Sequence, residues 1–219
     1  MATASDPRVL VLVALRLASI LPTESVVERS GLSAARVDDE LAGLEAAGLA
    51  RHRQGRVSGW MLSAEGRARC HELVAAEADG EVRLAVSEAY GRFLGVNQRL
   101  IDACTAWQLR TVDGAEVPND HADAAHDAAV LAEVAAIDDV AAPVCAELAD
   151  ALDRLGGYGP RLAAARARLD RGETEWLTGP TIDSYHTVWF ELHENLLMTL
   201  GIERGQERPP ATTPLQEAR

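Results

Sequence analysis

The sequence predicts a mainly α-helical protein with one small β-hairpin in its first third and an all-helical domain after it. Two observations lead to this prediction. Apolar residues recur at helical spacing over most of the chain, beginning with Val9, Val13 and Leu17. Two short β-prone segments flank the turn Gln54-Gly55-Arg56, and beyond Leu73 the sequence indicates no further strand. Residues 1–75 are therefore expected to form a first domain, and residues 76–204 a helical second domain.

The first domain is predicted to contain three helices, a hairpin and a fourth helix. Thr23 and Ser33 are suited to begin helices as caps, and Gly31 and Gly48 are suited to end them. Ser63 is the expected cap of the fourth helix. The expected elements are helices at 8–19, 23–30 and 34–47, strands at 49–53 and 57–62, and a helix that begins at 64.

The charge of the chain is divided unevenly between these two parts. The net charge is −13, yet residues 1–75 carry nine Arg and nine Asp or Glu residues and are neutral. The whole acidic excess therefore lies in the second domain. Only the first domain is expected to approach a polyanion such as a nucleic acid, because the second would be repelled.

The order helix, helix, helix, hairpin, helix is that of a winged helix-turn-helix domain. Within it, the runs Gly48-Leu49-Ala50-Arg51 and 60–67 (WMLSAEGR) resemble the MarR family of bacterial transcriptional regulators, and the resemblance extends from Val9 to about Leu73. It implies a homodimer that binds double-stranded DNA, with the third helix in the major groove and the hairpin as the wing. The DNA-binding residues that it implies are Ser33, Ala34, Ala35, Arg36, Asp39 and Glu40 in the helix, and Arg51, Arg53, Gln54 and Arg56 in the wing.

Three consecutive acids early in the third helix leave a second function open. Asp38, Asp39 and Glu40 stand against a single Arg36. Acids near a helix N-terminus are favoured by the helix dipole, and one acid can accept a hydrogen bond from cytosine, but three beside phosphates repel DNA. The alternative is a winged-helix adaptor that binds a protein partner and no DNA.

The second domain is predicted to be a bundle of helices joined by polar turns. Pro143 is expected to bend its second helix, since proline removes a backbone donor. The expected helices are 81–110, 121–155, 161–171 and 182–200, with a polar loop at 111–120, a turn at 156–160 and a disordered tail at 205–219.

The last helix carries the strongest signal for a binding site. One predicted stripe contains Tyr185, Trp189, Leu192 and Leu196, and a neighbouring stripe contains His186, Phe190, His193 and Leu197. Three interpretations are open: the two His are core residues, they line an effector pocket, or they bind a metal ion with Asp183. The candidate effector-binding residues are Trp107, Arg110, Tyr185, His186, Trp189 and His193.

The sequence contains no complete catalytic signature of the zinc-hydrolase or nucleotide-binding kind. His193-Glu194 begins the zinc-hydrolase pattern, but Leu197 occupies the place of its second His, and a chain without Lys has no phosphate-binding Walker motif. We therefore expect a regulator without cofactor or enzymatic activity; a metal-dependent enzyme or sensor using Asp183, His186 and His193 is the alternative. Three widely spaced Cys residues favour reduced thiols in the cytoplasm, and no segment is expected to enter a membrane.

Overall fold

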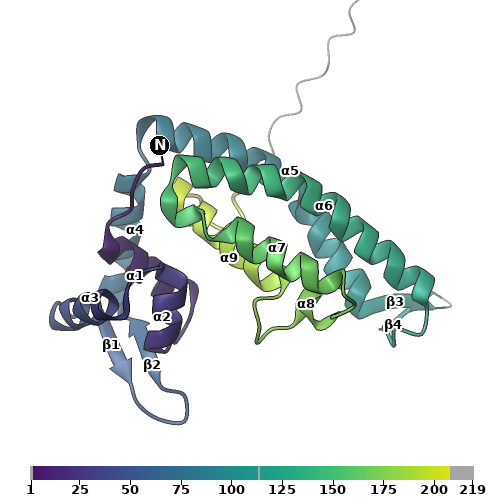
Figure 1. Cartoon of the computed structure of the whole chain (residues 1–219), viewed down its shortest axis with the longest axis horizontal. Helices are drawn as coiled ribbons and strands as arrows, with labels where there is room; N and C mark the ends of the chain where they lie inside the picture. The colour runs from purple at the N-terminus through teal and green to yellow at the C-terminus, as the bar shows by residue number, and fades with distance from the viewer. Residues whose placement is uncertain (1, 113, 208–219) are drawn as a thin grey trace, which may run out of the picture.

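The computed structural model describes residues 2–112 and 114–207, which form an elongated, mainly helical molecule with two small antiparallel hairpins. The first hairpin and the helices around it lie at one end of the long axis, and the second hairpin lies at the other end (Figure 1). The N-terminal elements are α1 (Pro7–Leu17), α2 (Thr23–Ser30), α3 (Ala34–Ala46), β1 (Ala50–Arg53), β2 (Gly59–Leu62) and α4 (Ala64–Glu77). The remaining elements are α5 (Gly80–Gln108), β3 (Leu109–Val112), β4 (Ala115–Pro118), α6 (Ala124–Ala151), the 3-10 turn η1 (Asp153–Leu155), α7 (Tyr158–Leu169), α8 (Glu175–Thr178) and α9 (Tyr185–Leu200).

The first four helices and the first hairpin, residues 7–77, enclose a core of their own and are called the N-terminal unit. Its helices begin and end close to where the sequence predicts. Ser33 caps α3 by accepting a hydrogen bond from the Arg36 amide, and Gly31 ends α2 with a left-handed backbone (φ 67°). The buried residues of this core include Leu12, Leu15, Val26, Val37, Leu41, Leu44, Leu62, Cys70 and Val74.

The first hairpin is shorter than its predicted strands. Ala50 pairs with Leu62 and Arg53 pairs with Gly59, so residues 57 and 58 belong to the connecting loop. Trp60 anchors the base of the hairpin: its backbone pairs with Leu21, and its indole N–H donates to the Thr23 hydroxyl at 3.2 Å. The hairpin therefore has a fixed base and a free tip.

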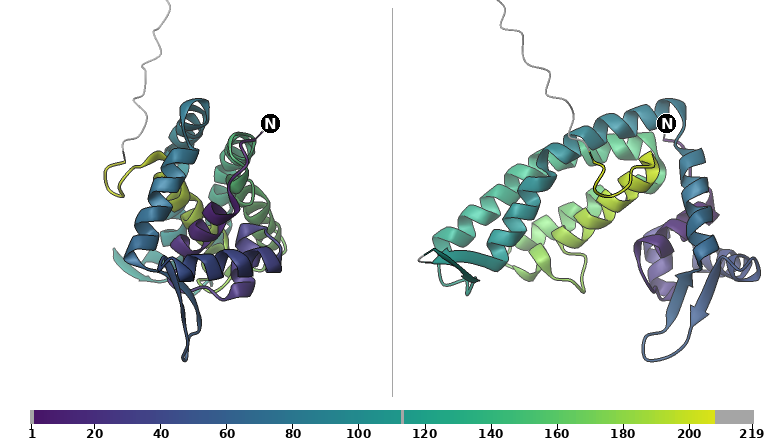
Figure 2. Two further views of the ribbon diagram at one scale, coloured as in Figure 1. Left: turned by 90° about the vertical axis from the view of Figure 1, so that its left-hand side faces the viewer. Right: turned by 180° about the vertical axis from the view of Figure 1, so that it is seen from behind.

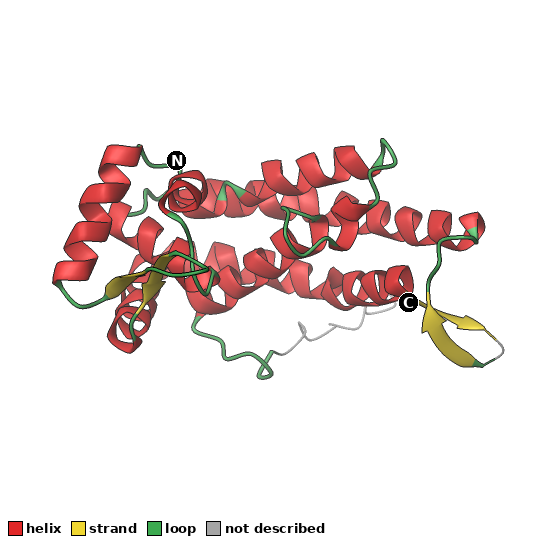
Figure 3. Ribbon diagram, turned by 90° about the horizontal axis from the view of Figure 1, so that it is seen from below, coloured by secondary structure: helices red, strands yellow, loops and turns green. Residues whose placement is uncertain are grey.

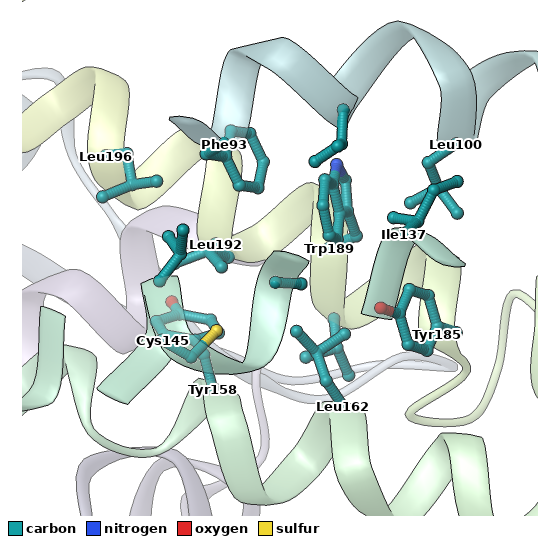
Figure 4. Packing of buried hydrophobic residues seen from close by; sticks show 14 of the residues in the cluster. Phe93, Leu100, Ile137, Cys145, Tyr158, Leu162, Tyr185, Trp189, Leu192 and Leu196 are labelled. Atoms are coloured by element: carbon teal, nitrogen blue, oxygen red, sulfur yellow. The ribbon is translucent and has the colours of Figure 1, made fainter. Parts of the chain in front are cut away.

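The bundle consists of α5, α6, α7 and α9. The long helices α5 and α6 lie side by side, and α7 and α9 pack against them (Figures 1 and 2). Its core is aromatic around Trp189, whose ring stacks on Phe93 with centroids 4.4 Å apart (Figure 4). Other buried members are Leu100, Ile137, Cys145, Tyr158, Leu162, Tyr185, Leu192 and Leu196.

The second hairpin corrects the prediction that no strand follows Leu73. β3 continues directly from α5, and β4 pairs with it from Leu109–Pro118 to Val112–Ala115 (Figure 3). The sequence carried a signal for this hairpin, because Asp113-Gly114 is a dipeptide typical of two-residue turns. The four-residue strands are mostly exposed, so they lack the apolar alternation on which strand prediction depends.

Smaller differences concern the ends of the bundle helices. α6 is a single helix that runs through Pro143 from Ala124 to Ala151, so the predicted bend does not interrupt it. α7 begins at Tyr158, within the predicted turn, and neither η1 nor α8 was predicted. Most of the predicted disordered tail, 208–219, lies outside the described residues.

Helix α9 joins the bundle to the N-terminal unit. Ser184 caps it and Gly201 ends it in a left-handed conformation (φ 65°). One side of α9 fills the bundle core, while Met198 packs on the N-terminal core with its sulfur 3.8 Å from that of Cys70. None of the described helices combines the length and apolar character that crossing a bilayer requires.

Candidate functional site

The first hairpin carries three arginines, one near its base and two at or next to its tip. Arg51, Arg53 and Arg56 are exposed, as is Gln54, and among the described residues none of the three arginines forms an ion pair. Mutual hydrogen bonds between Gly55 and Ser58 close the loop, at 3.2 Å and 2.9 Å. The hairpin projects away from the bundle (Figures 1 and 2). Its positive charge is therefore available to a partner outside the chain.

The exposed face of α3 lies next to this hairpin in the fold and has mixed charge. Ser33, Ala34, Ala35 and Arg36 are exposed on its first turn, as expected for residues that meet a partner. Asp38 and Asp39 are also exposed. Buried Val37, Leu41 and Leu44 hold the opposite face in the core.

The third acid of α3 does not face outward, which corrects the expectation for Glu40. Its side chain is only 10% exposed; it accepts a hydrogen bond from Arg8 Nε at 3.2 Å and forms an ion pair with Arg36, with Nη2 at 2.8 Å. The i,i+4 spacing of Arg36 and Glu40 favours this pair in a helix. Glu40 therefore attaches α3 to α1, and it partly neutralises the one basic residue on the exposed face.

Tyr185 and Trp189, two of the predicted effector-binding residues, are part of the bundle core. The Tyr185 hydroxyl donates to Asp138 Oδ1 at 2.9 Å, and the Trp189 indole N–H donates to Asn97 Oδ1 at 2.8 Å. Both rings are buried in the aromatic core shown in Figure 4. Their polar atoms are hydrogen-bonded within the bundle, as buried polar groups normally are. Core packing therefore accounts for these two aromatic residues of α9.

The other four predicted effector-binding residues are spread along the length of the bundle. Trp107 and Arg110 are at the far end of the bundle, where the Trp107 ring is 4.5 Å from that of His121 and Arg110 pairs with Asp120 at 3.2 Å. His186 is exposed near the start of α9, whereas His193 is buried in its middle. The six candidates therefore do not form one pocket.

The candidate metal ligands Asp183, His186 and His193 are likewise separated. Both Asp183 oxygens are held by Arg161, at 2.7 Å from Nε and 3.0 Å from Nη2. His193 lies 3.5 Å from the Tyr90 hydroxyl, and burial lowers its pKa. Within 2–112 and 114–207, no three His, Cys, Asp or Glu side chains are placed so that they could hold a metal ion.

The second predicted stripe of α9 was expected to border the buried face along its whole length, but only half of it is buried. Phe190 is 47% exposed and His186 is exposed, while His193 and Leu197 are buried. The Phe190 ring is covered on one face by the Arg204 guanidinium, 4.9 Å from its centroid. The N-terminal half of this stripe therefore faces solvent, and only its C-terminal half is buried.

A cavity of about 610 Å³ lies where the N-terminal unit meets the bundle, and we call it the junction cavity. One wall is apolar and comes from α1: Leu10, Val13, Ala14 and Leu17. The rest of the lining is mostly polar and comes from α2, η1, α7, the segment 180–183 and α9. The cavity is thus bounded by both parts of the molecule, and its walls have opposite character.

A chain of ion pairs crosses one side of the junction cavity. Arg161 of α7 binds Asp183 and, through Nη2, Glu191 of α9 at 2.8 Å. The other oxygen of Glu191 accepts from Arg29 of α2. Hydrogen bonding and charge from Arg161 lower the pKa of Asp183, which keeps this carboxylate ionised. Glu191 is therefore shared between an arginine of the bundle and one of the N-terminal unit.

A second polar network forms the floor of the junction cavity. Arg154 donates to Glu77 at 2.6 Å and to the Thr199 hydroxyl at 2.8 Å, and it also donates to Asn195. The amide of Asn195 donates in turn to the Tyr158 hydroxyl at 3.0 Å. Burial raises the pKa of Tyr158 to about 12, so this phenol remains a neutral hydrogen-bonding group.

The sequence does carry a signal for the junction cavity, on a different face of the last helix from the two predicted stripes. Asp183, Thr187, Glu191, Asn195 and Thr199 recur at every fourth position and form a polar row that begins just before α9 and continues along it. The arginines that meet this row come from three other elements, so no local pattern reveals them.

Known proteins give no further guide to this site. No protein-family model, curated protein or solved structure matches the chain.

Proposed function

We propose that the protein is a DNA-binding transcriptional regulator and that its N-terminal unit is a winged helix-turn-helix domain. The observation that carries the proposal is a hairpin that follows three helices and bears three exposed arginines, none of which forms an ion pair within residues 2–112 and 114–207. Arginine side chains on such a wing can bind phosphates or enter a narrow minor groove.

In this proposal α3 enters the major groove. Ser33, Ala35 and Arg36 would meet the DNA, and the alanines would permit a close approach of the helix backbone. Arg36 would leave Glu40 to bind a guanine edge, the commonest specific contact of arginine. Asp38 and Asp39 would face the groove as the unfavourable part of the surface.

The acidic bundle sets how the regulator would approach DNA. It would face away from the duplex, and three wing arginines give a salt dependence of about −3 in log K against log salt for each bound unit. A homodimer would place two units on half-sites about one helical turn apart. Such a dimer remains part of the proposal.

Fluorescence anisotropy against the DNA upstream of the protein's own gene, titrated across salt, tests the proposal. Tight binding that weakens with salt and is lost in an R53A/R56A variant is the expected result. R99A/R171A is the matched control, because it removes two exposed arginines from the bundle. Equal binding of specific and random DNA, or equal loss in both variants, would overturn the proposal.

A protein-interaction adaptor is the second candidate, and the exposed acids Asp38 and Asp39 of α3 favour it. A D38R/D39R variant separates the two functions. It should strengthen DNA binding by a regulator, since it removes repulsion from phosphates, and it should abolish partner capture by an adaptor.

A further inference from the structure

The far end of the bundle carries an open groove of about 280 Å³ between α5, the second hairpin and the start of α6, and we call it the tip groove. Figure 3 shows this end of the molecule, where the second hairpin projects beyond the helices. Three large apolar side chains are exposed here: Ile101 (44%), Leu109 (37%) and Val112 (41%). Leu109 lines the groove, and Ile101 lies one helical turn before Thr105, which lines it too. Exposed apolar side chains that gather in one place indicate a surface for a partner.

The tip groove has an excess of negative charge. The charged or titratable side chains that line it are Asp102, Arg110, Glu116 and His126. Arg110 already faces Asp120 and Asp123, at 3.2 Å and 4.0 Å, and His126 Nε2 lies 2.8 Å from the carbonyl oxygen of Ala106. Asp102 and Glu116 differ, because neither forms an ion pair with any residue of 2–112 and 114–207. The groove therefore favours a partner that brings positive charge together with an apolar side chain.

The tip of the first hairpin, residues 53–58, has the complementary composition, and we call it the wing tip. Arg53 and Arg56 are exposed and form no ion pair in the described part of the chain. Val57, next to Arg56, is 58% exposed. The wing tip and the tip groove lie at opposite ends of the long axis (Figure 1). They cannot meet within one copy, so a contact between them requires a second copy.

We propose that the wing tip of one copy binds the tip groove of a second copy. Arg53 and Arg56 face Asp102 and Glu116 in this contact, and Val57 covers Leu109. Opposite charges on the two surfaces steer the encounter and fix its orientation. The contact is small and its ion pairs are exposed, so the association is weak and reversible. Because it joins different surfaces of the two copies, it forms either an open chain or, where it is mutual, an antiparallel pair.

The contact also competes with DNA, a step that rests on the proposed function. Arginines of the wing tip that face the acids of a second copy are not available to phosphates. The second copy and the duplex therefore exclude each other at the same side chains. Self-association thus holds the regulator in a form that does not bind DNA, and an excess of duplex DNA should dissociate it.

Sedimentation equilibrium of the full chain over a wide range of concentration tests the contact without DNA. The average mass should rise with concentration and fall with added salt, because salt screens exposed ion pairs. R53A/R56A and D102N/E116Q should each weaken the association by about tenfold or more, which corresponds to about 1.4 kcal/mol. An equimolar mixture of these two variants should associate more strongly than either alone, since one supplies an intact groove and the other an intact wing tip.

The matched control is D139N/D150N, which removes two exposed acids from α6 and should associate as the parent does. A mass that stays constant with concentration, an unchanged association in D102N/E116Q, or a mixture no stronger than its components would overturn the contact. A parent of constant mass that binds an oligo-arginine peptide through Asp102 and Glu116 would also overturn it, and would assign the groove to another basic protein.

The competition with DNA is decided separately. If the copies associate through the two surfaces but excess duplex DNA leaves the association unchanged, the contact stands and the competition is wrong. If the protein binds no DNA at all, the sedimentation result still decides the contact by itself.

Discussion

Arg154 of η1 and Glu77 of α4 form an ion pair that is almost closed to solvent, with Nε 2.6 Å from Oε2 and side chains 1% and 9% exposed. Nη1 and Nη2 of Arg154 each donate to α9, to Asn195 and to Thr199. One guanidinium thus joins the end of the N-terminal unit to two elements of the bundle. Because its hydrogen bonds fix direction as well as distance, it sets the orientation of the two parts more strictly than apolar contact would.

Removing one partner of this pair should destabilise the protein strongly. E77Q leaves the Arg154 charge buried without its counter-ion, and a loss of about 3–5 kcal/mol in the free energy of unfolding is expected. E147Q is the control, because it breaks the exposed pair with Arg92 and should cost about 1 kcal/mol or less. Urea unfolding followed by tryptophan fluorescence measures both, and similar losses in the two variants would contradict the role of Arg154.

Local sequence patterns predicted the N-terminal unit well because its boundaries are set by adjacent residues. Ser33 and Ser63 cap helices within their own segments, and Gly31 ends a helix through its own backbone. The hairpin at β3 and β4 was missed for a related reason. Its short, exposed strands contain little apolar periodicity, so only the Asp113-Gly114 turn marks them.

The close packing of α4 on the segment before the hairpin gives a second stability prediction. A Cβ added at Gly66 would lie 1.9 Å from the Leu49 carbonyl oxygen, which already accepts from the Ser63 amide. G66A should therefore cost about 1–3 kcal/mol or more, since backbone must move. G95A is the control: a Cβ there meets nothing within 4 Å, and the helix should gain about 0.5–1 kcal/mol. Thermal unfolding of both variants would reveal opposite shifts, and a neutral G66A would be inconsistent with this packing.

The candidate site was harder to predict than the fold, because its members come from separate elements. The aromatic and His residues of α9 drew attention by their chemical type, yet Tyr185 and Trp189 satisfy their polar atoms inside the bundle. The polar row that includes Glu191 faces arginines of α2, η1 and α7. Only tertiary packing brings these groups together, so no local spacing could identify them as one site.

The Arg36–Glu40 pair leads to a prediction about DNA affinity under the proposed function. E40Q removes a carboxylate from α3 and frees Arg36 from its ion pair. DNA binding should become about two- to fivefold tighter, as expected for about 0.5–1 kcal/mol from one ion pair whose arginine is half exposed. Anisotropy with the upstream DNA measures it, with E45Q as a control on the same helix. Unchanged or weaker binding in E40Q would mean that Arg36 does not contact the DNA.

The buried His193 should make stability depend on pH. Burial is the main cause that lowers its pKa below the usual value, and Glu207, 3.6 Å away, only partly opposes it. The unfolded chain then binds more protons than the folded one as pH falls below the usual value of about 6.5, so folding stability is retained above that pH and lost below it. Urea unfolding at about pH 7.5 and pH 5.5 should give a smaller loss in H193Q than in the parent, whereas H71Q, at an exposed His, should lose as much as the parent. Equal pH dependence in the parent and H193Q would show that the burial of His193 does not contribute to the loss of stability at low pH.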